Sequence, residues 1–545
     1  MRSLEIKNSH FILFALAAAM VLFFPVSYTH LFDWDEINFA ESSREMLVSG
    51  NYFQVQVNFE PFQEKPPFFF WLQTLSYQLF GVNEYAARFP NALFGMLSVI
   101  SLYLIGKRLY NSNFGFIWAL VYIGSILPFL YAKSGIIDPV FNLFIFLSLY
   151  FLIRTINESK GRRSGIYASL AGVSIGLAII TKGPVGFLLI LLSFLVFWSI
   201  ERFRRISNIR DIFVFATSTL LVTTLWFGYE TTQNGPWFLI EFIKYQIELF
   251  SEPVAGHAQP FYYHFVVILL GCFPMSFYAL PMFFQPGMRD VFQFRKWMAV
   301  LFWVVLILFS ISTTKIVHYS SMCYLPLSYL AALHIFQISE KQQILSKGLQ
   351  VAILVVGIVF SVLFFALPLL LENPQWIIPY IKDKFAVAAL NTITEADPSL
   401  KYIAVFYLAM FFVIMFAHTR RHVLHGVIRL SLLNMLFLSV YLNKVVPEIE
   451  AFSQRPAIEF FKELKGQDVY VNVIGYKSYA QLFYFEQPLN TETEKKHLEW
   501  QLHGEIDKPV YLVTRIDRLH EVEHHTHLKE VKRRGGFVLL VRELP

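Results

Sequence analysis

Residues 348–371 read GLQVAILVVGIVFSVLFFALPLLL, an unbroken run without a charged side chain. A helix needs about 20 mostly apolar residues to cross the hydrocarbon core of a bilayer, so this run predicts a membrane-spanning helix. Similar runs recur along the chain, and the composition agrees with them. Of the 545 residues, 56% are hydrophobic and 15% are charged. We therefore expect an integral membrane protein and not a soluble one.

The same length criterion predicts about 13 spans, so the expected fold class is mainly α, a polytopic transmembrane helical bundle. The predicted spans cover residues 10–28, 90–106, 114–132, 137–153, 166–181, 184–200, 211–228, 261–284, 297–312, 319–336, 348–371, 402–417 and 422–442. The first of them has no small-residue cleavage site after it, so it is interpreted as a retained span and not as a signal peptide.

Lys and Arg residues gather at alternate junctions between these spans. Positive-inside bias places those junctions, and the N-terminus, in the cytoplasm. The other junctions then face outward. The longest of them is the first external loop, residues 29–89. Its segment 36–48 is predicted to be an interfacial helix with apolar residues on one face and charge on the other. Its segment 68–80 is apolar but too short to cross the membrane, and it is predicted to be a second surface helix or a re-entrant helix.

The composition changes after residue 446. Residues 453–464 have the pattern of a helix, and residues 468–474, 510–514 and 537–541 have the pattern of strands. We expect two domains, a transmembrane domain over residues 1–446 and a small soluble α/β domain over residues 447–545. An odd number of spans places the second domain outside the cytoplasm.

Two motifs in the first external loop are candidates for chemistry. Asp35 and Glu36 follow Trp34, and a carboxylate there could deprotonate an attacking hydroxyl, although it could also simply begin a helix. The second motif is Glu64-Lys65-Pro66-Pro67. Its prolines restrict the chain ahead of them, so Lys65 is held in a way that suits a phosphate, although anchoring to lipid is the alternative.

Other candidate residues lie at outward-facing junctions, and cations from several junctions at one leaflet would suit a phosphorylated lipid. They are Lys133, Asp138, Lys182, Lys315, His318 and Tyr319. Each of them alone could be an interfacial anchor. Glu64 and His257 could form a divalent metal site, with zinc as the candidate metal, although zinc usually takes three or four protein ligands.

Several classes of function are disfavoured. The chain has no Walker motif and no dinucleotide-binding glycine pattern, so no nucleotide cofactor is expected. Its basic residues form short clusters beside the spans, which argues against nucleic-acid binding. Apart from histidines, only Arg429 lies well inside a predicted span, which argues against an ion-coupled transporter. Cys272 and Cys323 fall in hydrophobic segments and give no disulfide framework.

Taken together, the motifs resemble the GT-C membrane glycosyltransferases, in particular the bacterial lipid A aminoarabinose transferases and, more distantly, the protein O-mannosyltransferases. The resemblance extends over nearly the whole chain. It is carried by the acidic pair at Asp35, REMLVSGNY from Arg44, EKPP from Glu64, FGVNEYAARFPNAL from Phe80 and TKGPVG from Thr181. It implies an inverting transfer of a sugar from a polyprenyl-phosphate donor to an envelope acceptor, at the outer face of the bacterial cytoplasmic (inner) membrane.

Carried over position by position, the resemblance also implies roles for single residues. Asp35 is similar to the essential first-loop aspartate of the family, Lys65 to its donor-phosphate lysine and Tyr319 to a tyrosine near the donor. Glu64 with His257 corresponds to the metal pair, and Asp138 to a second acidic position. One departure is that lipid A transferases usually have Arg-Tyr shortly after the acidic pair, where this chain has Asn38-Phe39.

That departure leaves the sugar and the acceptor open, so lipid A phosphate, another glycolipid, a glycan and a protein all stay possible. The sequence does not predict the oligomeric state. Two other functions are alternatives to the transferase: a flippase or transporter of a lipid-linked sugar, and an envelope scaffold protein whose C-terminal domain recruits partners.

Overall fold

The computed structural model describes residues 7–24, 29–62, 64–158, 161–203, 208–251, 259–284, 290–392, 397–418, 423–489 and 492–544. Most of these residues are helical. The elements up to the end of the bundle are α1 (Asn8–Phe23), α2 (Asp35–Ser49), β1 (Gln56–Val57), β2 (Glu60–Pro61), α3 (Phe68–Phe80), α4 (Glu84–Leu109), α5 (Ser112–Ile123), α6 (Ile126–Tyr131), α7 (Asp138–Asn157), α8 (Arg162–Lys182), α9 (Val185–Ile200), α10 (Ile209–Asn234), α11 (Trp237–Ser251), α12 (Tyr263–Gly271), α13 (Met275–Ala279), α14 (Pro281–Phe284), η2 (Val291–Gln293), α15 (Phe294–Ile311), η3 (Val317–Cys323), α16 (Tyr324–Glu340), α17 (Lys347–Glu372), η4 (Pro374–Trp376), η5 (Ile378–Tyr380), α18 (Lys384–Asn391), α19 (Lys401–His418) and α20 (Val423–Lys444).

The predicted fold class, a mainly α transmembrane bundle, is confirmed. Within the described ranges, eight helices are long and apolar enough to cross a membrane, and the bent pair Tyr263–Gly271 and Met275–Phe284 makes a possible ninth span. The other four predicted spans coincide with the shorter apolar helices α1, α5, α9 and α19. Every predicted span therefore has an apolar helix at its position.

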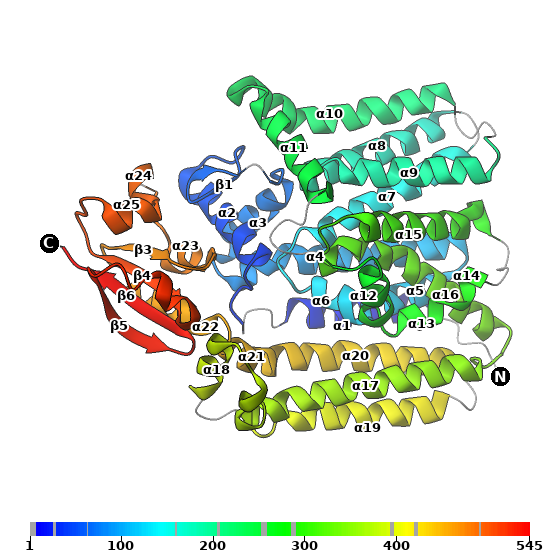
Figure 1. Cartoon of the computed structure of the whole chain (residues 1–545). Coiled ribbons are helices and arrows are strands. Elements are labelled where there is room, and N and C mark those ends of the chain that lie inside the picture. The colour runs from blue at the N-terminus through cyan, green and yellow to red at the C-terminus, as the bar shows by residue number, and fades with distance from the viewer. Residues whose placement is uncertain are drawn as a thin grey trace.

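The helices lie side by side along one direction (Figure 1). α7 packs on α8, α8 packs on α10, and α17, α19 and α20 form a second group of neighbours. The segment Val317–Glu340, which contains η3 and α16, is buried along its most apolar stretch and therefore lies in the interior of the bundle. Its surroundings are apolar and aromatic, and the buried Trp118 donates a hydrogen bond from Nε1 to Ser328 Oγ at 2.9 Å. This interior position matters because η3 carries His318.

The first external loop contains the two predicted helices, α2 and α3, joined through the short hairpin β1–β2. Gly50, with φ 71°, ends α2 in the left-handed conformation that glycine adopts readily. The charged face of α2 differs from the prediction, because it is buried instead of facing water. Arg44 forms hydrogen bonds of 2.7 Å from Nε and Nη2 to the two carboxylate oxygens of Glu41, and its Nη2 also donates to the carbonyl of Gln487 at 3.1 Å.

The chain after α20 forms a C-terminal segment that contains both helices and strands. Its elements are α21 (Val446–Ala451), α22 (Arg455–Leu464), β3 (Tyr470–Val473), α23 (Ala480–Phe485), α24 (Thr493–Lys496), α25 (Leu498–His503), β4 (Val510–Arg515), η6 (Ile516–Glu521), β5 (Leu528–Arg534) and β6 (Phe537–Arg542). The sheet has the order β3-β4-β6-β5, with β3 and β4 parallel and the other pairs antiparallel. The predicted helix and three predicted strands are present, and β5 is the strand that the sequence pattern missed.

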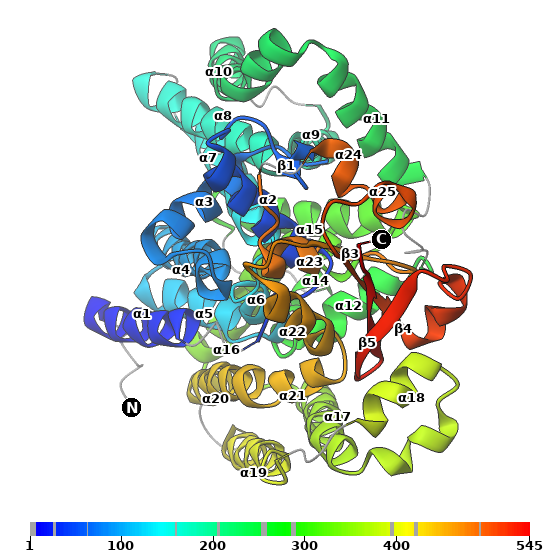
Figure 2. The same cartoon turned by 90° about the vertical axis from the view of Figure 1, so that its left-hand side faces the viewer.

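This C-terminal segment lies at the end of the bundle opposite the N-terminus (Figure 1). Figure 2 looks onto that end, where α23 lies against the first-loop helix α2. Buried contacts join the two regions: His30 Nδ1 lies 2.7 Å from Glu450 Oε1, and the backbone N–H of Leu31 donates to the hydroxyl of Tyr484 at 2.7 Å. The first external loop is thus held between the bundle and the C-terminal segment.

Candidate active site

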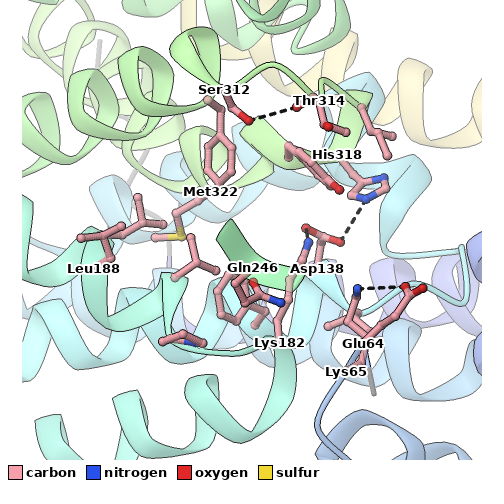
Figure 3. Close-up of a pocket in the computed structure, with 18 of the residues that line it drawn as sticks. Glu64, Lys65, Asp138, Lys182, Leu188, Gln246, Ser312, Thr314, His318 and Met322 are labelled. Atoms are coloured by element: carbon pink, nitrogen blue, oxygen red, sulfur yellow. Dashed lines mark hydrogen bonds and ion pairs between the residues drawn. The ribbon is translucent and has the colours of Figure 1, made fainter. Parts of the chain in front are cut away.

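A cavity of about 590 Å³ opens where the first external loop meets the bundle, and it collects most of the predicted site residues. Those that line it are Asp35, Glu64, Lys65, Asp138, Lys182, His318 and Tyr319. They come from the start of α2, the loop before α3, the start of α7, the end of α8, and η3. Figure 3 shows the labelled Glu64, Lys65, Asp138, Lys182 and His318 around the same space.

Asp138 and Lys182 form the tightest ion pair of this cavity. Asp138 is the first residue of α7 and Lys182 is the last residue of α8, and the packing of these two helices brings the side chains together. Lys182 Nζ lies 2.6 Å from Asp138 Oδ1, and the two side chains are 16% and 6% exposed. A carboxylate this deeply buried is stable when a cation neutralises it, so the pair gives a fixed, nearly neutral wall.

His318 stands between two carboxylates from different helices. Its Nε2 lies 3.5 Å from Asp35 Oδ2 and 3.9 Å from Asp138 Oδ2. Ser321, one helical turn further along η3, donates to Asp138 Oδ1 at 3.3 Å and accepts a 2.8 Å hydrogen bond from Asn142. The contacts of His318 place Asp35 at the edge of a connected polar group instead of leaving it isolated in the loop.

Glu64 and Lys65 reach the cavity from the loop that precedes α3. Lys65 Nζ lies 3.7 Å from Glu64 Oε2 and 5.4 Å from the ring centroid of Tyr245. The Tyr245 hydroxyl, from α11, donates to Glu64 Oε2 at 2.8 Å. The Lys65 to Glu64 separation is longer than a hydrogen bond, so this ammonium is held in place less tightly than that of Lys182 and can meet an incoming anion.

The remainder of the cavity wall is apolar. Leu188 and Leu191 line it from α9, and Ile243 and Ile247 line it from α11. These four side chains are 40% to 60% exposed, so the apolar wall continues to the outer surface of the bundle. One site therefore combines a charged end at the first external loop with an apolar passage between two helices.

Glu36 was predicted as a catalytic residue, but the structure places it outside the cavity. Its carboxylate accepts hydrogen bonds of 2.8 Å from Arg88 Nε and Nη2, of 2.8 Å from the backbone N–H of Phe32 and of 2.6 Å from that of Gly135. Burial raises the pKa of Glu36, but Arg88 and these donors together lower it below its ordinary value. With its acceptor positions occupied, Glu36 fixes the loop and cannot take a substrate proton.

Lys133 and Lys315 were predicted to bind substrate, and neither of them lines the cavity. Lys133 Nζ donates to the backbone carbonyls of Val21 and Phe24 at 2.8 and 3.0 Å. It thus supplies hydrogen bonds to carbonyl groups at the C-terminal end of α1. Burial lowers the pKa of Lys133 to about 8. Lys315 is buried and donates to the backbone carbonyl of Ser312 at 2.5 Å. Both lysines donate to backbone carbonyls, distant in sequence for Lys133 and local for Lys315, and a sequence pattern does not reveal these partners.

Of the predicted metal pair, the structure describes Glu64, whereas His257 lies outside the described residues. Within the ranges that the structure describes, no group of three or more His, Cys, Asp and Glu side chains is arranged to hold a metal ion. Glu64 offers a carboxylate at the cavity, yet zinc usually takes three or four protein ligands. The described residues alone do not fit a zinc centre, and the metal site stays a prediction.

Sequence reasoning missed several polar residues of the site, among them Tyr245, Asn142 and Ser321. Tyr245 lies in α11, within the stretch that was treated as an external junction, although the spacing of the apolar residues in that stretch is helical. Asn142 and Ser321 lie one turn after Asp138 and His318, respectively. The spacing of one helical turn was the available signal for both of them.

The charged end of the cavity places a cation and a carboxylate next to each other. Lys65 places positive charge where an anionic leaving group would sit, whereas the charge of Lys182 is balanced by Asp138. Asp35 is 33% exposed and offers a carboxylate that reaches into the cavity, whereas Asp138 is 6% exposed and neutralised by Lys182. This arrangement suits the transfer of a group away from a lipid-linked phosphate.

Comparison with known proteins agrees with the resemblance read from the motifs. Residues 64–240 match the family model described as dolichyl-phosphate-mannose-protein mannosyltransferase. The crystal structure of ArnT from Cupriavidus metallidurans in the apo state superposes with a TM-score of 0.78 and covers 98% of both chains, at 18% sequence identity. This chain has the same fold as that ArnT. The structure of the same ArnT bound to undecaprenyl phosphate gives a TM-score of 0.76, also over 98% of both chains and at 18% identity.

Curated relatives share part of the sequence. The undecaprenyl phosphate-alpha-4-amino-4-deoxy-L-arabinose arabinosyl transferase of Wigglesworthia glossinidia brevipalpis is 27% identical over 58% of this chain and 57% of its own length. The enzyme of the same name from Yersinia enterocolitica is 26% identical over 62% of this chain and 61% of its own. The chain thus spans about three fifths of the length of these relatives, and it resembles the aminoarabinose transferases.

Proposed function

We propose that this protein is an inverting glycosyltransferase that moves a sugar from a polyprenyl-phosphate donor to an envelope acceptor. The observation that carries the proposal is the cavity in which Asp35 and Lys65 face the same space at the mouth of an apolar passage. A membrane-embedded carrier with an anionic head and a long hydrocarbon tail is the class of molecule that such a cavity fits.

At the donor end, the phosphate lies near Lys65 and the isoprenoid tail lies between α9 and α11. Breaking the bond between the sugar C1 and the phosphate oxygen leaves negative charge on the departing polyprenyl phosphate. Lys65, which lies next to Tyr245 and Glu64, stabilises that charge. The tail never has to leave the apolar phase, because the passage opens toward lipid.

At the acceptor end, an oxygen of the acceptor attacks C1 from the side opposite the phosphate, and the new C1–O bond forms as the old one breaks. If the acceptor is a hydroxyl, its proton passes to Asp35, whose carboxylate is exposed to the cavity. If the acceptor is a phosphate, which is already anionic, Asp35 orients it. In both cases polyprenyl phosphate is the second product.

The protein is a multi-pass membrane protein, and we place it in the bacterial cytoplasmic (inner) membrane. The N-terminus would lie in the cytoplasm, and the cavity and the C-terminal segment would lie outside. The geometric support is that the N-terminus and the C-terminal segment are at opposite ends of the bundle (Figure 1). A divalent metal held by Glu64 and His257 remains part of the proposal, and no step above depends on it.

The test is sugar transfer by purified protein from polyprenyl-phosphate donors to membranes that contain lipid A, glycan and protein acceptors. We expect Asp35→Asn and Lys65→Ala each to lower the transfer rate by at least about 100-fold, because each removes a group that acts on the reacting atoms. Thermal unfolding should be unchanged in Asp35→Asn, whose side chain is partly exposed.

Lys244→Ala is the matched control. Lys244 precedes Tyr245 on α11, has a side chain that is 60% exposed, and pairs with Glu241 outside the cavity. Its removal should leave transfer unchanged. Full activity in both Asp35→Asn and Lys65→Ala would refute the proposal. Movement of labelled donor across liposomes without any new glycosidic bond would favour a flippase instead.

A further inference from the structure

The tip of the β1–β2 hairpin, in the first external loop, is held from two sides. Asn58 and Phe59 form this tip, and both have a φ of 57°. On one side, their backbone N–H groups donate to the two carboxylate oxygens of Glu45, at 2.6 and 2.7 Å. Glu45 is fully buried on α2, so its carboxylate fixes the tip of the hairpin to the first helix of the loop.

On the other side, the tip contacts a lysine of the C-terminal segment. Lys496 is the last residue of α24, and its Nζ donates to the backbone carbonyl of Asn58 at 3.2 Å. The same ammonium lies 5.0 Å from the centroid of the Phe59 ring, within the range of a cation–π contact. In both views of the molecule, α24 lies next to β1 (Figure 1 and Figure 2). The hairpin tip is therefore clamped between α2 and the C-terminal segment.

Lys496 is only 6% exposed, and lysine is rarely buried so deeply unless it is paired. The carbonyl and the ring that it contacts belong to the first external loop. The carboxylates that attract its charge, those of Glu45 and Glu60, belong to the same loop. The buried ammonium is thus directed at the loop, although its backbone belongs to the C-terminal segment.

The clamped hairpin leads to the cation of the cavity. Its two strands pair antiparallel, and the backbone N–H of Phe62 donates to the carbonyl of Val55 at 2.8 Å, so the tip and the strands form one unit. Lys65, which lines the cavity, follows Phe62 by three residues. The distance of 3.7 Å from its ammonium to Glu64 is longer than a hydrogen bond, so the position of Lys65 depends on the backbone that carries it.

We propose that Lys496 is a positioning residue for sugar transfer, which holds the hairpin tip and thereby places Lys65 at the phosphate of the polyprenyl donor. The inference rests on the proposed function and adds a part for the C-terminal segment, which acts on the donor site without lining the cavity. Small displacements of a group that meets the reacting atoms have large effects, so this contact contributes more than attachment of two segments.

The experiment measures the affinity of undecaprenyl phosphate for the full-length protein in detergent, which requires neither the sugar nor the acceptor. Lys496→Met keeps a long side chain and removes the charge and the N–H donors. We expect it to weaken binding by about 10-fold, a usual size for coupling within one network. Lys65→Ala should weaken binding by about 10- to 100-fold, the effect of losing a hydrogen bond to a charged group.

The double variant Lys65→Ala/Lys496→Met separates positioning from a general effect on folding. If Lys496 acts through Lys65, the double variant should bind no more weakly than Lys65→Ala alone, because the two losses are then not additive. Lys496→Arg should restore the wild-type affinity, since a guanidinium also donates to a carbonyl and stacks on an aromatic ring.

Lys495→Met is the matched control, because this neighbouring lysine pairs with Glu492 and Asp507 inside the C-terminal segment. It should bind undecaprenyl phosphate like the wild-type protein. Phe59→Leu is a milder second variant, which removes the ring beside Lys496 and keeps the backbone hydrogen bonds of the tip. It should weaken binding in the wild-type background and have no effect in Lys65→Ala.

Wild-type affinity in both Lys496→Met and Phe59→Leu would overturn the inference. Losses of the same size with and without Lys65 would overturn it as well, because they indicate a general effect on folding. Wild-type affinity in Lys65→Ala is a different result, which would refute the proposed donor site itself and the inference with it.

Discussion

At the residue scale, the acidic pair of the first external loop shows how two adjacent carboxylates acquire different roles. Asp35 begins α2 and lines the cavity beside His318. Glu36 points the other way and is enclosed by Arg88 and two backbone donors. Sequence alone could identify the pair as a functional candidate. It could not assign the roles, because the partner of Glu36 lies 52 residues away on another helix.

We predict that Glu36→Gln destabilises the protein without removing a reacting group. The substitution leaves the guanidinium of Arg88 buried without its carboxylate, and breaking a buried pair typically costs about 3–5 kcal/mol. The unfolding temperature in detergent should fall clearly, whereas the neighbouring Asp35→Asn should keep it. A Glu36→Gln protein with native stability and no activity would contradict this assignment and return Glu36 to the chemistry.

At the element scale, the TKGPVG motif sets the junction between α8 and α9. Lys182 ends α8, Gly183 adopts φ 112°, and Pro184 directly precedes α9. A side chain at Gly183 would place its Cβ 2.8 Å from Cζ of Phe242 on α11. Glycine is therefore required both by the backbone angle and by the close packing of α11, and this junction holds Lys182 against Asp138.

We predict that Gly183→Ala lowers both stability and transfer. The backbone strain should cost about 1–3 kcal/mol. Displacement of Lys182 and α11 should lower the transfer rate by about 10- to 100-fold, since small misplacements of a reacting geometry have effects of that size. Gly348→Ala is the control, because a Cβ there meets nothing within 4 Å. Wild-type transfer rate and unfolding temperature in Gly183→Ala would show that the junction tolerates a side chain.

At the scale of the whole molecule, hydropathy predicted the helices well, because length and apolar composition decide membrane insertion locally. Burial of α2 was missed, since its charged residues pair with each other and with Gln487, more than 400 positions away. The strand β5 was missed as well, because its sequence LKEVKRR is mostly charged and it lies at the edge of the sheet. The sequence predicted most of the residues that line the candidate site. Only the three-dimensional structure shows that Glu36, Lys133 and Lys315 do not line it.

The central claim is that the polar end and the apolar passage of one cavity bind one lipid-linked phosphate. A cryo-electron microscopy structure of the protein with bound polyprenyl phosphate tests it most directly. We predict phosphate density within about 4 Å of Lys65 Nζ, the distance of an ion pair, with the tail running between α9 and α11. Phosphate density at another surface, with the cavity between Asp35 and Lys65 unchanged from the lipid-free protein, would contradict the claim.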